Sequence, residues 1–292
     1  MAQQPGVPGE DFNSSGDTPA SSGGTSTWGY IAQFVFTMLQ LNFLLLFTLS
    51  PILFVVLALA NPLQAILGLG LALVLISPGI AAAFATFRDC PTLHTALAGS
   101  GRAGMATPAA SAAGAIAGSY WSAEDGNAVF KPYFRAYRRL AKRALLVSLP
   151  LTVFTVIVIV EMQMLTQVSW ATYLVPTLLV LLLLALGAWL PSLVMVVEMP
   201  QAKVVPIIRN GVYLALRRWY LTLLNLLTLV ALSVGLIMET IIVAVFIMGP
   251  VLYFVWANSR WLLMPMVEAL ENACLDDLPP DQRRRLTRRY GR

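Results

Sequence analysis

Three long apolar stretches without a single lysine or arginine set the limits on what this chain can fold into. No Lys or Arg occurs before Arg88, between Arg143 and Lys203, or between Arg218 and Arg260. Each stretch is long enough for one or two membrane-spanning helices of about 20 residues. Runs such as TLLVLLLLALGAWL lack the alternation of apolar and polar residues that a transmembrane barrel requires. The pattern therefore predicts an all-α, polytopic transmembrane helical bundle.

The apolar stretches divide into about six predicted spans, which pair along the chain as three hairpins. The junction between the last two spans, Met238–Thr240, has no strong turn residue, but the stretch from Arg218 to Arg260 is too long for one span. The predicted spans are residues 31–60, 63–87, 144–162, 170–197, 220–238 and 241–263.

The charged residues predict which ends of these spans share a membrane face. Only 11% of the residues are charged, against roughly 25% in soluble domains. The basic residues fall within 88–143, 203–218 and 260–292, and the span junctions near 61, 163 and 239 carry none. The positive-inside rule then predicts a multi-pass protein of the cell membrane with both termini cytoplasmic. The net charge of +5 reflects these cytoplasmic anchors and is no evidence for nucleic acid.

The composition changes at both ends of the predicted transmembrane domain, residues 29–270. Residues 1–28 are rich in Gly, Ser, Pro and Thr and are predicted to be a disordered tail. They carry no Lys or Arg and no apolar core, so a signal peptide is not expected. Residues 95–120 are predicted to be a flexible, Ala/Gly-rich cytoplasmic loop, and 271–292 a basic cytoplasmic tail.

A basic segment, FKPYFRAYRRLAKRALL at 130–146, precedes the third span. Phe130, Phe134, Tyr137, Ala141 and Leu145 recur at spacings of three to four, which predicts an amphipathic helix on the cytoplasmic leaflet. The cations stop where the apolar run begins, which disfavours a voltage sensor, and a nucleic-acid arm would need a surface that can leave the bilayer. Two interpretations stay open, anchoring to anionic lipid headgroups and docking of a cytoplasmic protein. The cations of the segment are Lys131, Arg135, Arg138, Arg139, Lys142 and Arg143.

The segment PIIRNGVYLALRRWY at 206–220 resembles a second basic segment of this kind. It contributes Arg209, Arg217 and Arg218 to the predicted membrane-interface or docking residues. Both segments carry a proline three residues before an arginine, and both lead into a predicted span.

Residues that carry catalytic or metal chemistry are scarce. The chain has one histidine, His94, and two cysteines, Cys90 and Cys274, which are too few for a zinc site or a disulfide framework. No Walker A motif, Gly-rich dinucleotide loop or nucleophile elbow is present. We therefore expect no enzyme activity, no catalytic residue, no metal and no cofactor.

Polar residues within the predicted spans are few and are expected to form interhelical hydrogen bonds. They include Gln40, Asn42, Asn225 and Asn258. No ionisable residue lies near the centre of a span, where ion-coupled transporters usually place one. Glu161 and Glu239 at outer ends and Glu198 at an inner end are expected to be solvated.

Three stretches, LQLNFLLLFTLSPILF, LISPGIAAAFATFRD and FKPYFRAYRRLAKRALL, together resemble the YesL-like membrane proteins, a bacterial family of unknown function. The resemblance covers roughly 30–270; the loop at 95–120 and the N-terminal tail depart from it. It implies a bacterial inner-membrane protein with an accessory role in carbohydrate uptake and ABC-transporter components as partners. A permease for a small solute and a lipid-acting membrane enzyme are the alternatives. The matching positions are Asn42, Pro51, Pro78, Ala82, Ala83, Phe130, Phe134 and Arg138.

Overall fold

The computed structural model describes residues 27–57, 62–90, 93, 117–121, 128–165, 167, 173–239 and 242–276. All regular secondary structure within these ranges is helical, which confirms the predicted all-α class. Most of the predicted N-terminal tail, the loop at 95–120 and the basic C-terminal tail lies outside them. The described parts of those segments are 27–28, 117–120 and 271–276.

Six long helices follow one another along the chain, and each corresponds to one predicted span. All six are long and apolar enough to cross a membrane, so the chain is a multi-pass integral membrane protein. The short helix α7 (Val204–Arg217) precedes α8, and the π-helical turn η3 (Val243–Ile247) precedes α10. The six long helices are α1 (Thr27–Leu57), α2 (Pro62–Asp89), α5 (Phe130–Leu165), α6 (Val175–Glu198), α8 (Trp219–Met238) and α10 (Met248–Asp276).

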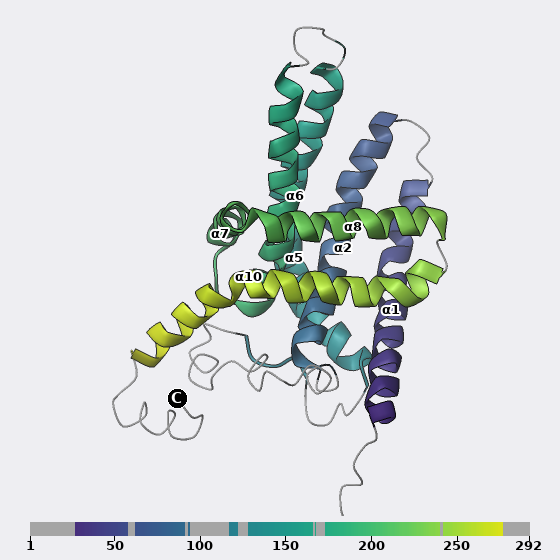
Figure 1. The fold of residues 1–292 in the computed structure, drawn as a ribbon, viewed down its shortest axis with the longest axis vertical. Helices are drawn as coiled ribbons and strands as arrows, with labels where there is room; N and C mark the ends of the chain where they lie inside the picture. The colour runs from purple at the N-terminus through teal and green to yellow at the C-terminus, as the bar shows by residue number, and fades with distance from the viewer. Residues whose placement is uncertain are drawn as a thin grey trace, which may run out of the picture.

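The three hairpins are not equivalent in space. α5 and α6 lie side by side, α2 packs most extensively on α5, and α1 packs on α2. α8 and α10 run across the direction of α5 and α6, and α7 is seen end-on beside them (Figure 1). The sequence predicts three hairpins without their relative directions, and in the structure the third lies across the direction of α5 and α6.

The π-helical turn η3 sits near the midpoint of α1. Asn42 Nδ2 donates a hydrogen bond to the carbonyl oxygen of Val245 at 2.6 Å. A π-turn loosens the main-chain ladder and leaves a carbonyl that a side chain can reach. The predicted junction near 239 is therefore followed by a turn that packs on α1.

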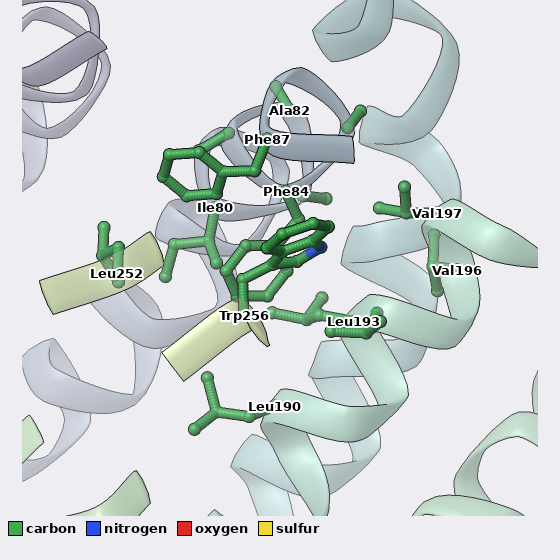
Figure 2. Packing of buried hydrophobic residues seen from close by; sticks show 14 of the residues in the cluster. Ile80, Ala82, Phe84, Phe87, Leu190, Leu193, Val196, Val197, Leu252 and Trp256 are labelled. Carbon is green, nitrogen blue, oxygen red and sulfur yellow. The ribbon is translucent and has the colours of Figure 1, made fainter. Parts of the chain in front are cut away.

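The core lies where α2, α6 and α10 meet (Figure 2). Trp256 of α10 packs between α2 and α6, and its ring centroid lies 5.9 Å from that of Phe87. The run Ala81–Ala83 in α2 is fully buried, because helices pack on more than one side of α2 and small side chains let their backbones approach. This packing brings the C-terminal ends of α2 and α6 together beside α10.

The basic segment forms the first turns of α5 itself rather than a separate helix. Its packed row is Tyr133, Ala136, Leu140 and Ala144, which faces the rest of the protein. Tyr133 is fully buried, and its hydroxyl lies 3.2 Å from Thr48 Oγ1 and 3.3 Å from the carbonyl oxygen of Gly79. The predicted apolar row that begins with Phe130 and Phe134 is exposed, as a row that faces the leaflet would be, so the segment has two apolar rows and the sequence predicted only one.

Candidate functional site

Four charged side chains form a buried cluster where α2, α6 and α10 meet. Arg88 Nε lies 2.7 Å from Asp89 Oδ1, and Arg88 Nη1 lies 3.7 Å from Glu198 Oε2. Arg260 Nε lies 3.3 Å from Glu198 Oε1. The two positive and two negative charges compensate one another. We call Arg88, Asp89, Glu198 and Arg260 the charge cluster.

Local sequence explains why both carboxylates stand at helix ends. Asp89 and Glu198 each lie two residues before a proline, in the sequences DCP and EMP, and a proline cannot continue the helix. The C-terminal end of a helix carries partial negative charge, which disfavours a carboxylate there and favours a cation. The guanidinium groups of Arg88 and Arg260 supply that cation.

The cluster corrects the expectation that Glu198 is solvated. Only 3% of Glu198 and 2% of Arg88 is exposed. The prediction was wrong because α10, which is distant in sequence, covers this end of α6 and brings Arg260 with it. Removing one partner of such a pair leaves an uncompensated buried charge, so the loss of either partner is expected to destabilise the contact between these helices.

A five-residue strap, Ala117–Trp121, crosses the cluster. Arg88 Nη2 donates to the carbonyl oxygen of Gly118 at 2.8 Å, and the amide of Tyr120 donates to Asp89 Oδ2 at 2.5 Å. The amide of Ala117 donates to the main-chain carbonyl of Glu198 at 2.8 Å. The strap includes the end of the predicted flexible loop, and here that end is fixed by hydrogen bonds to α2 and α6.

Two aromatic rings flank the guanidinium groups of the cluster. Arg88 lies 5.3 Å from the ring centroid of Tyr120, and Arg260 lies 5.4 Å from that of Trp256. Both distances suit a cation–π contact. Burial raises the pKa of the Tyr120 hydroxyl above its usual value, and the positive charge of Arg88 opposes that rise. The Tyr120 side chain is therefore neutral at physiological pH, and its ring contacts the Arg88 guanidinium.

The cations predicted on the basic segment of α5 divide into two groups. Lys131, Arg138, Arg139 and Lys142 are exposed. Three of these cations, all except Lys142, line an open hollow of about 640 Å³ on the helix, together with Arg135 and two exposed phenylalanine rings. We call its lining the α5 basic face, which consists of Phe130, Lys131, Phe134, Arg135, Arg138 and Arg139.

The other cations of α5 bond within the protein. Arg135 Nη1 donates to the carbonyl oxygen of Tyr120 at 2.9 Å. The guanidinium of Arg143 donates to the main-chain carbonyls of Met199, Pro200 and Ala202, which connect α6 to α7. These two arginines were predicted as interface residues, and the structure gives both of them partners in the chain.

The predicted second copy of the basic segment corresponds to α7 and the start of α8. Arg209 and Arg217 are exposed, and Arg218 Nη1 donates to the carbonyl oxygen of Trp261 at 3.4 Å. Gly211 brings α7 close to α6, because a Cβ at this position would lie 3.0 Å from the carbonyl oxygen of Ala188. The cations of α7 do not line the hollow on α5.

Two of the predicted intramembrane polar residues meet between α8 and α10. Asn258 Nδ2 donates to Asn225 Oδ1 at 2.7 Å, and Asn225 Nδ2 donates to Ser259 Oγ at 2.9 Å. Asn42 binds η3 as described above. The Oε1 atom of Gln40 is buried and has no hydrogen-bond partner within the described residues.

Replacing Asn225 with alanine is expected to destabilise the α8–α10 pair. Asn225 is buried, and its loss removes a donor to Ser259 and an acceptor for Asn258. Interhelical hydrogen bonds in membranes contribute about 0.6–2 kcal/mol, so we expect a loss of that size in the free energy of unfolding. Reversible unfolding in detergent micelles measures it. Thr228→Ala is the control, because its hydroxyl bonds only within α8; an equal loss in both variants would contradict the interhelical role.

No group of three or more His, Cys, Asp or Glu side chains within the described ranges could hold a metal ion. The arrangement is instead one of internally paired charges beside an exposed basic face. Comparison with known proteins assigns no relative, because no family model, no curated protein and no solved structure matches the chain.

Proposed function

We propose that this integral membrane protein is a non-catalytic accessory component of a transport system in the bacterial inner membrane. The resemblance to the YesL-like proteins supports carbohydrate uptake as the process and ABC-transporter components as the partners. The three basic clusters support a topology with both termini in the cytoplasm, where the α5 basic face would meet a cytoplasmic subunit.

The division of the charged residues carries this proposal. Arg88, which is buried, and Arg260, which is partly buried, are paired with Asp89 and Glu198 inside the protein. Lys131, Arg138 and Arg139 are exposed next to Phe130 and Phe134, and none of the six residues that line the hollow is acidic. Cations beside exposed aromatic rings are typical of surfaces that bind other macromolecules. The charges that hold the fold are thus separate from those that remain available to a partner.

Affinity purification of the full chain from its native membranes, after mild crosslinking, tests the proposal. We expect the wild-type chain to recover a component of a transport system. Charge reversal on the α5 basic face (Lys131→Glu, Arg138→Glu and Arg139→Glu) is expected to lower that recovery about tenfold, since exposed charge pairs control encounter and partner choice.

The matched control reverses three exposed cations on and beside α7, by Lys203→Glu, Arg209→Glu and Arg217→Glu. It changes the net charge by the same amount and is expected to leave recovery close to that of the wild type. A wild-type chain that recovers no transport component would contradict the accessory role. Solute flux through vesicles that contain only the purified chain would support the permease alternative instead.

A further inference from the structure

The strap Ala117–Trp121 depends on charged side chains for most of its attachment. One hydrogen bond between the strap and the described helices, from the Ala117 amide to the carbonyl oxygen of Glu198, joins two main-chain atoms. The others use the guanidinium of Arg88, the carboxylate of Asp89 and the guanidinium of Arg135. Ala117 and Tyr120 are buried, whereas Gly118 and Ser119 between them are exposed. The strap is therefore held at two buried points.

Arg135 connects the α5 basic face to the strap. Its side chain lines the hollow of the α5 basic face, and its Nη1 atom donates to the carbonyl oxygen of Tyr120. The amide of the same residue, Tyr120, donates to Asp89 of the charge cluster. A continuous series of contacts thus runs from the exposed face through Arg135 and Tyr120 to Asp89.

The chemistry of this shared arginine makes its bond to Tyr120 replaceable. The bond joins a guanidinium to a neutral carbonyl, whereas a carboxylate offers two anionic oxygens in the geometry that a guanidinium matches. In the bond to Tyr120 only the donor is charged, whereas in a guanidinium–carboxylate pair both partners are charged and two parallel hydrogen bonds form. A partner's carboxylate placed in the hollow would compete with the Tyr120 carbonyl for the same group.

We propose that the strap is a latch that couples the α5 basic face to the charge cluster. A carboxylate bound at the face draws Arg135 away from the Tyr120 carbonyl and releases the strap from the ends of α2 and α6. The proposal rests on the proposed function only in taking the α5 basic face as the surface where the partner's acidic groups arrive. Release of the strap would change its contacts with the charge cluster, which joins α2, α6 and α10, whenever a partner occupies the α5 basic face.

Hydrogen–deuterium exchange of the full chain in nanodiscs of zwitterionic lipid tests the latch. The readouts are the amides of Ala117 and Tyr120, which donate to Glu198 and Asp89. Arg135→Gln is expected to speed exchange at both amides about tenfold, because a hydrogen bond to a charged group is lost. Arg138→Gln is the matched control, since it removes an exposed cation of the same face, and it is expected to leave both amides at wild-type rates.

A hexaglutamate peptide serves as the anionic probe, with hexaglutamine as its neutral counterpart. Hexaglutamate is expected to speed exchange at Ala117 and Tyr120 in the wild-type chain and to have no further effect on Arg135→Gln. Unchanged amides in Arg135→Gln, or in the wild type with saturating hexaglutamate, would overturn the latch. Unchanged exchange in the buried part of α6 shows that a variant is folded. These experiments need no transport component, so the latch and the accessory role can fail separately.

Discussion

Replacing Glu198 with alanine is expected to lower the free energy of unfolding by about 3–5 kcal/mol, because breaking a buried ion pair leaves its partner charge uncompensated. The carboxylate lies between Arg88 and Arg260, at 3.7 and 3.3 Å, and its loss takes one anionic partner from each guanidinium. Reversible unfolding in mixed micelles, followed by tryptophan fluorescence, measures the change. The expected loss is a large share of the stability of an ordinary domain.

Glu161→Ala provides the matched control for this prediction. It makes the same chemical change at an exposed position of α5, where a substitution is expected to cost no more than about 0.5 kcal/mol. The double variant Glu198→Ala/Arg260→Ala should lose less stability than the two single variants added together, since it removes a charge together with its partner. Equal losses in Glu198→Ala and Glu161→Ala would show that the cluster does not hold the helices together.

Gly211→Ala is expected to destabilise the protein by about 1–3 kcal/mol, because it overpacks the contact between α7 and α6. The new Cβ would clash with Ser192 Oγ and would lie 3.0 Å from the carbonyl oxygen of Ala188. Ser192 cannot simply turn away, since its hydroxyl donates to that carbonyl at 2.7 Å. The same unfolding measurement applies, and crosslinking between cysteines placed on α6 and α7 would report the separation of the helices.

Gly235→Ala is the matched control, because this glycine also lies within a helix but has space around it. A Cβ at position 235 would meet the side chain of Val243 at 3.4 Å, an ordinary contact. Alanine is the better helix former by about 1 kcal/mol, so this change is expected to be neutral or stabilising. A Gly211→Ala variant as stable as Gly235→Ala would mean that α7 does not need its close approach to α6.

The number and order of the helices could be predicted because the bilayer acts on each span separately. A stretch of about 20 apolar residues is sufficient to specify a spanning helix, whatever the rest of the chain does. The cation-free interval between Arg143 and Lys203 thus predicted α5 and α6 correctly as a pair. How α8 and α10 cross the other helices depends on contacts such as Asn42 with Val245, which join residues far apart in sequence. No periodicity within one segment contains that information.

The candidate site was harder to predict, because its residues also meet through contacts between segments that are far apart in sequence. Arg88 was taken as a topology marker and Glu198 as a solvated helix end, because nothing near either residue in sequence shows that they meet. One signal was present: Asp89 and Glu198 end two different spans in the same way, two residues before a proline. Similar helix ends that carry similar charges are candidates for a shared cation. The outward position of Phe130 and Phe134 was within the predicted pattern, whereas the buried row with Tyr133 was not.

The π-helical turn η3 makes α10 unusually sensitive to chain length at one point. A helix advances about 100° per residue, so a turn that holds one extra residue sets the rotation of α10 relative to the contact that η3 makes with α1. Gly249 lies just after η3, and a Cβ there would come 2.5 Å from Asn42 Oδ1. Deleting a single residue within 243–247 would restore a regular helix but rotate this close approach away from α1. Length variation in this stretch should therefore be far less tolerated than substitution.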